Sequence, residues 1–155
     1  GNAISNDVPL FRYADALMIK AECLLRSGVA GGADAAAAIV SDIRTRAFAA
    51  TNPAKATVTG VQLQAGSSYN YGTYKDGVML TTEGGADIEY GRFLDELGYE
   101  FAAEFHRRQD LIRFGVFTTK SWLSHTPTGD HRILYDIPQA ALNANPNLDH
   151  NPGYN

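Results

Sequence analysis

Residues 11–27, FRYADALMIKAECLLRS, carry the pattern that decides the fold class. Their apolar side chains, among them Tyr13, Leu17, Ala21 and Leu24, recur every three or four residues, as on one face of an α-helix. The glycine that follows is suited to end a helix in a left-handed conformation. The segment therefore predicts an amphipathic helix that must bury its apolar face against another element.

Residues 33–48, ADAAAAIVSDIRTRAF, predict a second helix, with Ala36, Val40 and Ile43 on one face. Only the turn VAGG, residues 29–32, separates the two helices, so they must pack antiparallel. Such a hairpin is typical of a tetratricopeptide-type unit, and only one is found in this chain. Because a lone helical pair cannot bury its own face, another segment must cover it.

A third long helix is predicted over residues 90–114, YGRFLDELGYEFAAEFHRRQDLIRF. Leu94, Leu97 and Phe101 recur at helical spacing, and Gly115 is expected to end the helix. With the hairpin, this helix predicts a mainly α fold.

Two other segments have no helical period. Residues 51–89 are rich in Gly, Ser, Thr and Tyr and predict a long irregular loop, with short strands at 58–63 and 78–80. Residues 133–155, ILYDIPQAALNANPNLDHNPGYN, hold three prolines and five asparagines, which favour turns. We expect this tail to wrap over the surface and help cover the hairpin, held by Ile133, Tyr135, Ile137, Leu142 and Leu148.

Composition excludes several classes of protein. The chain of 155 residues is expected to form a single domain over 1–155, and its net charge of −4 argues against nucleic-acid binding. There is no apolar run approaching the ~18 residues of a membrane span. The four histidines and the single cysteine lack the spacing of a metal motif, so neither a metal nor a cofactor is expected.

The stripe Glu96, Glu100 and Glu104 admits two interpretations. Carboxylates four apart on a helix have Cβ atoms roughly 5–6 Å apart, which allows a glycosidase hypothesis with Glu100 and Glu104 as acid and nucleophile. Alternatively these side chains form ordinary ion pairs, with Glu104 bound to Arg107 and Arg108 further along the helix. The second interpretation is favoured, so no enzyme is expected.

Aromatic residues in the loops are the better candidates for ligand binding. Tyr69, Tyr71 and Tyr74 cluster in the Gly-rich segment, and Trp122 follows the third helix. Flat amphipathic rings suit the apolar faces of sugars, and these four are the predicted ligand-binding residues. The alternative is that the rings fill a small core of the irregular segment.

Four stretches together resemble the C-terminal part of the SusD/RagB family of surface glycan-binding lipoproteins. Residues 8–28 resemble its helix that begins Arg-Tyr-Ala, and residues 36–47 its partner helix that ends Ile-Arg-x-Arg-Ala. Residues 100–115, EFAAEFHRRQDLIRFG, resemble its helix with Arg-x-x-Asp-Leu-x-Arg. Residues 133–154 resemble its closing Tyr-x-Ile-Pro and Asn-Pro-Gly-Tyr motifs.

Three positions depart from the family pattern. Leu97 stands where the family often has Arg, Phe105 where it usually has Gly, and Phe114 where Trp is common. A Phe in place of Gly needs room, so we expect the helix packing around Phe105 to differ.

The resemblance implies non-catalytic binding of oligosaccharide at the bacterial cell surface, for delivery to a SusC-like TonB-dependent transporter of the outer membrane. The alternative is a protein-interaction module that docks on the transporter without binding sugar. Family members are longer, with a lipid-bearing N-terminus and further helical repeats, so the chain is expected to be a fragment or a minimal relative.

Overall fold

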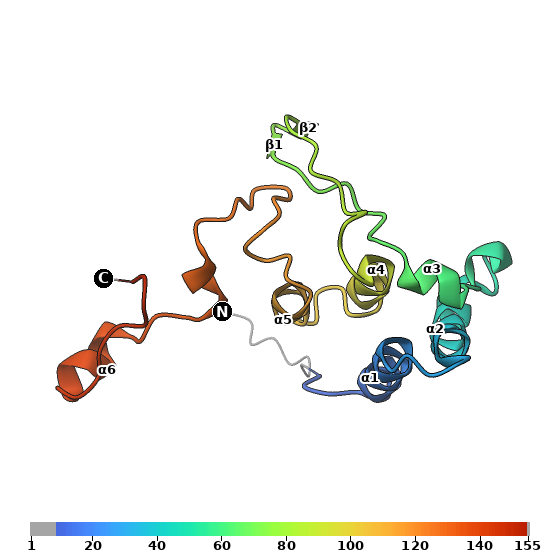
Figure 1. The fold of residues 1–155 in the computed structure, drawn as a ribbon, viewed down its shortest axis with the longest axis horizontal. Coiled ribbons are helices and arrows are strands. Elements are labelled where there is room, and N and C mark those ends of the chain that lie inside the picture. The colour runs from blue at the N-terminus through green and yellow to red at the C-terminus, as the bar shows by residue number, and fades with distance from the viewer. Residues whose placement is uncertain (1–8, 155) are drawn as a thin grey trace, which may run out of the picture.

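A computed structural model describes residues 9–154, so the first eight residues and Asn155 of the expected domain lie outside the description. Within the described part the architecture is mainly helical, with one short two-stranded sheet (Figure 1). The prediction of a mainly α fold is confirmed.

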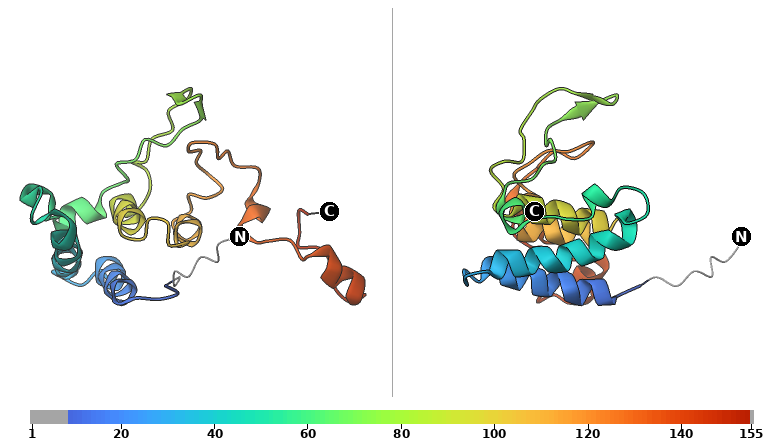
Figure 2. Two further views of the ribbon diagram at one scale, coloured as in Figure 1. Left: turned by 180° about the vertical axis from the view of Figure 1, so that it is seen from behind. Right: turned by 90° about the vertical axis from the view of Figure 1, so that its right-hand side faces the viewer.

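The expected hairpin consists of α1 (Tyr13–Arg26) and α2 (Gly32–Phe48), which lie side by side (Figure 2). Gly28 and Gly31 have positive φ angles of 68° and 76°, which glycine adopts without steric cost, and they allow the tight turn between the helices. At the start of α1, the Asp15 carboxylate accepts a hydrogen bond from the backbone N–H of Arg12 at 2.7 Å. The hairpin therefore forms where the sequence places it.

The apolar face of the hairpin is covered by α3 (Gly60–Gln64) and α4 (Gly91–Glu100). Met18 and Val40 of the hairpin share one buried cluster with Leu63 of α3 and Phe93 of α4. The strand expected at 58–63 is wrong: Thr59 and Gln62 form a capping box that starts a short helix instead.

The prediction of one long helix over residues 90–114 is also wrong, because this segment forms two helices, α4 and α5 (Arg107–Arg113). Between them, Ala103 and Phe105 have φ angles of 64° and 66°, in the left-handed region that an α-helix cannot continue through. Phe105 is 85% exposed, so its side chain needs no room in the core. The position requires a backbone angle that glycine adopts easily, which accounts for the glycine of the family pattern, whereas nothing in the structure explains the Phe that replaces it.

The long segment before α4 contains η1 (Pro53–Lys55) and a small hairpin of β1 (Tyr74–Lys75) and β2 (Val78–Met79). β2 lies within the strand expected at 78–80. Asp76 and Gly77 both have positive φ, as in the two-residue turns that suit the twist of paired strands. In Figure 1 this hairpin projects away from the helices.

The C-terminal tail contains η2 (Asp130–Ile133) and α6 (Gln139–Ala144). The expectation that it covers the hairpin is wrong: α6 lies at the opposite end of the molecule from α1 and α2 (Figure 1). The hairpin face is already occupied by α3 and α4, and the tail binds mainly to itself. For example, Asn151 Nδ2 donates to the Tyr135 carbonyl at 2.6 Å. Most of the apolar side chains expected to hold it are exposed.

Candidate functional site

Three of the four predicted aromatic residues meet in one cluster, although they come from two separate loops. Tyr69 packs edge-on against Tyr71 with ring centroids 4.8 Å apart, and Tyr71 packs edge-on against Trp122 at 6.3 Å. Trp122 in turn stacks on His125 at 3.8 Å. The loops before α4 and after α5 therefore bring their rings into one aromatic cluster.

Tyr71 differs from the expectation, because its ring is only 1% exposed. It belongs to a second buried cluster with Leu94, Leu111 and Val116, and burial raises the pKa of its hydroxyl. The structure makes Tyr71 a support beneath the cluster and leaves no ring face for a ligand. This matches the alternative that rings fill a small core of the irregular segment.

Tyr69 and Tyr74 lie nearer the surface. Tyr69 is 37% exposed, and burial, with Tyr74 nearby, raises the pKa of its hydroxyl. Tyr74 is half-buried in β1, and its hydroxyl donates to the carbonyl of Asn70 at 3.2 Å. Trp122 is also half-buried, so part of the residue reaches solvent.

A buried carboxylate anchors the Gly-rich loop. Asp95 of α4 accepts hydrogen bonds from the Ser67 hydroxyl, from the Ser68 backbone N–H at 2.7 Å and from the Ser68 hydroxyl at 2.8 Å. Sequence reasoning missed this role. The available signal was a carboxylate directly beside Leu94 on a helix face that must be buried, since a buried charge requires partners.

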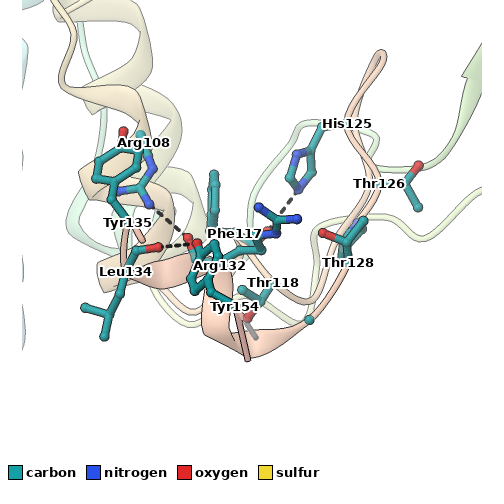
Figure 3. A pocket seen from close by; sticks show the side chains of 12 residues that line it. Arg108, Phe117, Thr118, His125, Thr126, Thr128, Arg132, Leu134, Tyr135 and Tyr154 are labelled. Carbon is teal, nitrogen blue, oxygen red and sulfur yellow. Dashed lines mark hydrogen bonds between the residues drawn. The ribbon is translucent and has the colours of Figure 1, made fainter. Parts of the chain in front are cut away.

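A hollow of about 230 Å³ lies beside the aromatic cluster, between α5, the loop after it and the tail (Figure 3). Aromatic rings, threonine hydroxyls and two guanidinium groups line it, and Figure 3 shows the side chains of Arg108, Arg132, Phe117 and His125 around the space. The hollow thus extends the aromatic surface into a concave site.

Contacts between cations and rings hold the walls of the hollow. The Arg108 guanidinium lies 4.1 Å from the ring centroid of Tyr135 and 5.0 Å from that of Phe117. Arg132 lies 5.3 Å from the ring centroid of Tyr154. The Tyr154 hydroxyl donates to the Leu134 carbonyl at 2.7 Å, which fixes the end of the tail against the site.

Sequence reasoning did not find this hollow, although it considered some of its residues for other roles. Arg108 was expected to pair with Glu104, and Tyr135 was expected to hold the tail on the hairpin. The Nη2 of Arg108 instead donates to the carbonyl of Arg132 at 2.9 Å. No local signal could reveal the contact, because α5 and η2 meet only in the tertiary structure.

The glutamate stripe serves packing between elements. Arg44 Nη1 donates to both Glu96 oxygens at 2.8 Å, and Arg12 binds Glu100 at 2.6 Å and Glu104 at 2.7 Å. The ion-pair interpretation holds, but most partners come from the hairpin, with Arg92 of α4 as a second partner of Glu96, rather than from Arg107 and Arg108 as expected for Glu104. These carboxylates are occupied by arginines at a packed interface between helices.

Two further findings bear on the chemistry. Residues 9–154 contain no group of three or more His, Cys, Asp or Glu side chains arranged to hold a metal ion. Across the same residues, every helix is too short or too polar to span a bilayer.

The described residues thus form a helical scaffold whose loops border a hollow lined by aromatic rings and arginines. The chain belongs to the SusD family, whose profile matches residues 1–132. It is 29% identical to the "Starch-binding protein SusD" of Bacteroides thetaiotaomicron over 96% of its own length. It spans 22% of the length of that relative.

Proposed function

We propose that this chain contributes to non-catalytic binding of oligosaccharide at the bacterial cell surface. The observation that carries the proposal is the aromatic cluster with its adjoining hollow, in a member of the SusD family. A relative named as starch-binding supports the same class of ligand.

The chemistry of the site suits a sugar. Pyranose rings present apolar C–H faces that stack on aromatic rings, while their hydroxyls need hydrogen-bond partners. Tyr69, Tyr74 and Trp122 are the rings we assign to stacking, with Tyr71 as their support. At about 230 Å³ the hollow is smaller than the ~300–1,000 Å³ of sites that enclose drug-sized ligands. It therefore suits one unit of a longer chain, with the neighbouring units on the open aromatic surface.

The tryptophan allows a direct test, because Trp122 is the single tryptophan of the chain. Titration with a panel of oligosaccharides should change its fluorescence, and Trp122→Ala, followed by calorimetry, should weaken binding by about 1–1.5 kcal/mol for the lost aromatic contact. Tyr99→Ala is the matched control, since Tyr99 is exposed on α4 and outside the cluster. Absence of any binding at millimolar sugar would refute the proposal.

We further propose that the bound glycan is delivered to a SusC-like TonB-dependent transporter at the outer membrane, as the resemblance implies. No enzymatic step is assigned, and the two candidate glutamates Glu100 and Glu104 are already bound by Arg12. An assay for reducing ends should stay blank with every oligosaccharide that binds.

A second candidate function is docking on the transporter without binding sugar. Val78 and Leu80, at the projecting β1–β2 hairpin, are each 63% exposed and offer an apolar contact. Replacing both with Ser should weaken binding to the purified transporter while leaving sugar titrations unchanged. If the transporter binds but no sugar does, docking is the function and the glycan proposal fails.

A further inference from the structure

The hollow is positively charged within a chain that is negative overall. The net formal charge of the chain is −4, yet the described residues that line the hollow include Arg108 and Arg132 and no carboxylate. Asp130 stands two positions before Arg132 but is not part of the lining. The local charge is thus opposite to that of the whole protein.

Most other arginines of this structure are neutralised. Six of them lie between 2.5 and 2.9 Å from a carboxylate oxygen: Arg12, Arg26, Arg44, Arg46, Arg92 and Arg113. Arg108 and Arg132 have no carboxylate within 4.0 Å among residues 9–154. Within the described residues, the charges of these two arginines are therefore not paired with a carboxylate and can interact with an anionic ligand.

The geometry of both side chains leaves donors available. Each guanidinium carbon lies over an aromatic ring, that of Arg108 over Tyr135 and that of Arg132 over Tyr154, and this contact with the ring does not occupy the N–H groups as hydrogen-bond donors. Arg108 commits its Nη2 to two backbone carbonyls, those of Arg132 and Ile133. The remaining N–H groups are suited to a planar or tetrahedral oxyanion, because a guanidinium edge can bind two oxygens at once.

The rest of the lining suits a sugar that carries the anion. Thr118, Thr126 and Thr128 supply hydroxyls that both donate and accept hydrogen bonds, as sugar hydroxyls require. Phe117 and His125 supply ring surface beside them. A bare inorganic anion would leave these groups unused.

We propose that the hollow binds a negatively charged sugar unit, through Arg108 and Arg132, and so selects anionic glycans over neutral ones. This inference rests on the proposed function and names its ligand class. The anion is a carboxylate, as in a uronic acid, or a sulfate ester, and both present oxygens to the same guanidinium edges.

Matched sugars test the proposal. The first pair is an oligogalacturonate and the same oligosaccharide with its carboxyl groups reduced to neutral alcohols, and the second is a sulfated oligosaccharide and its desulfated form. At least one anionic member should bind about tenfold more tightly than its neutral partner, as expected for one charge-assisted contact, and rising salt should reduce that difference. The arm that shows the difference identifies the anion.

Variants assign the effect to the hollow. Arg132→Gln should remove about tenfold of the affinity for the anionic sugar and leave neutral sugars unaffected, and Arg132→Lys should restore part of it. Lys20→Gln is the control, since it removes the same charge from an exposed position on α1. Arg132 is exposed and outside both buried clusters, so its loss should leave the fold intact by circular dichroism.

The outcomes separate the two proposals. Equal binding of both members in each pair would overturn anion selection and leave glycan binding standing. Equal losses from Arg132→Gln and Lys20→Gln would also overturn it, because the effect would then be one of net charge. If no sugar of either kind binds, the glycan-binding function fails as well.

Discussion

Phe105 should be destabilising where it stands, and Phe105→Gly should make the protein more stable. The residue lies between α4 and α5 with a φ of 66°, in the left-handed region, where a side chain brings Cβ close to the following carbonyl oxygen. Its ring is 85% exposed and contributes little burial in exchange. The strain at this position therefore has no compensating contact of the side chain.

The expected gain is a difference of two terms. Glycine occupies the left-handed region without a clash of Cβ, so the substitution relieves about 1–2 kcal/mol of steric cost. The greater freedom of glycine in the unfolded chain offsets roughly 0.5–1 kcal/mol of that gain. The net increase in the free energy of unfolding is between about 0 and 1.5 kcal/mol, and its midpoint of about 0.75 kcal/mol corresponds to a rise in Tm of about 2–3 °C for a chain of this size.

Urea denaturation followed by circular dichroism measures this change, with the free energy extrapolated to water. Ala102→Gly is the matched control, because Ala102 is exposed in the same segment and is not among the residues with positive φ. Glycine should destabilise at residue 102 and stabilise at residue 105. If Phe105→Gly lowers stability as much as Ala102→Gly does, the backbone at residue 105 is not strained and the reasoning is refuted.

Three other perturbations have defined outcomes. Asp95→Ala should lower the free energy of unfolding by about 2–4 kcal/mol, because three donors of the Gly-rich loop lose a buried charged acceptor. Hydrogen exchange of the backbone amides in that loop should become faster. An unchanged exchange rate would count against the anchoring role of Asp95. Burial opposes ionisation of Glu22, but Arg113 outweighs it and lowers the pKa of Glu22 below its ordinary 4.5. The stability that this carboxylate contributes is therefore present above pH 4.5 and lost as pH falls through the lowered pKa. Glu22→Gln should flatten the loss of stability below pH 4.5, and a wild-type slope in that variant would contradict this. Arg12→Lys should lower the free energy of unfolding by about 1–2 kcal/mol, because the Lys ammonium cannot bind two carboxylates as the forked guanidinium does. Arg46→Lys, at an exposed ion pair, should lower it by less than about 0.5 kcal/mol. Equal losses of stability in urea denaturation would exclude the forked geometry as the cause.

Local pattern was sufficient for the helical hairpin. The apolar spacing in residues 11–27 and 33–48 and the glycines between them are properties of neighbouring residues, and they predicted α1, α2 and the turn. The same reasoning failed between α4 and α5, because the apolar period continues through Phe101 and Phe105 while the backbone does not. Periodicity reports which face is apolar, and it is insensitive to two residues in a left-handed conformation.

The candidate site was predicted only in part. Composition indicated that rings in the loops matter, and Tyr69, Tyr71 and Trp122 do meet. Their roles depend on burial, which is set by contacts with segments far away in the chain. Tyr71 is buried because Leu94 and Leu111 of α4 and α5 close over it.

What the sequence by itself determined is the mainly α class, the hairpin and the type of side chain in the loops, which follow from residues close together in the chain, and the family, which follows from four motifs in their order along it. The tertiary structure alone decided which segment covers the hairpin, and that the tail instead walls a hollow against α5. It also decided that Arg108 and Arg132 keep their charge while most other arginines are paired. The physical reason is that burial and charge pairing are properties of three-dimensional neighbours, and the contacts that set them join residues far apart in the chain, for example 24 positions apart for Arg108 and Arg132 and 91 for Glu22 and Arg113.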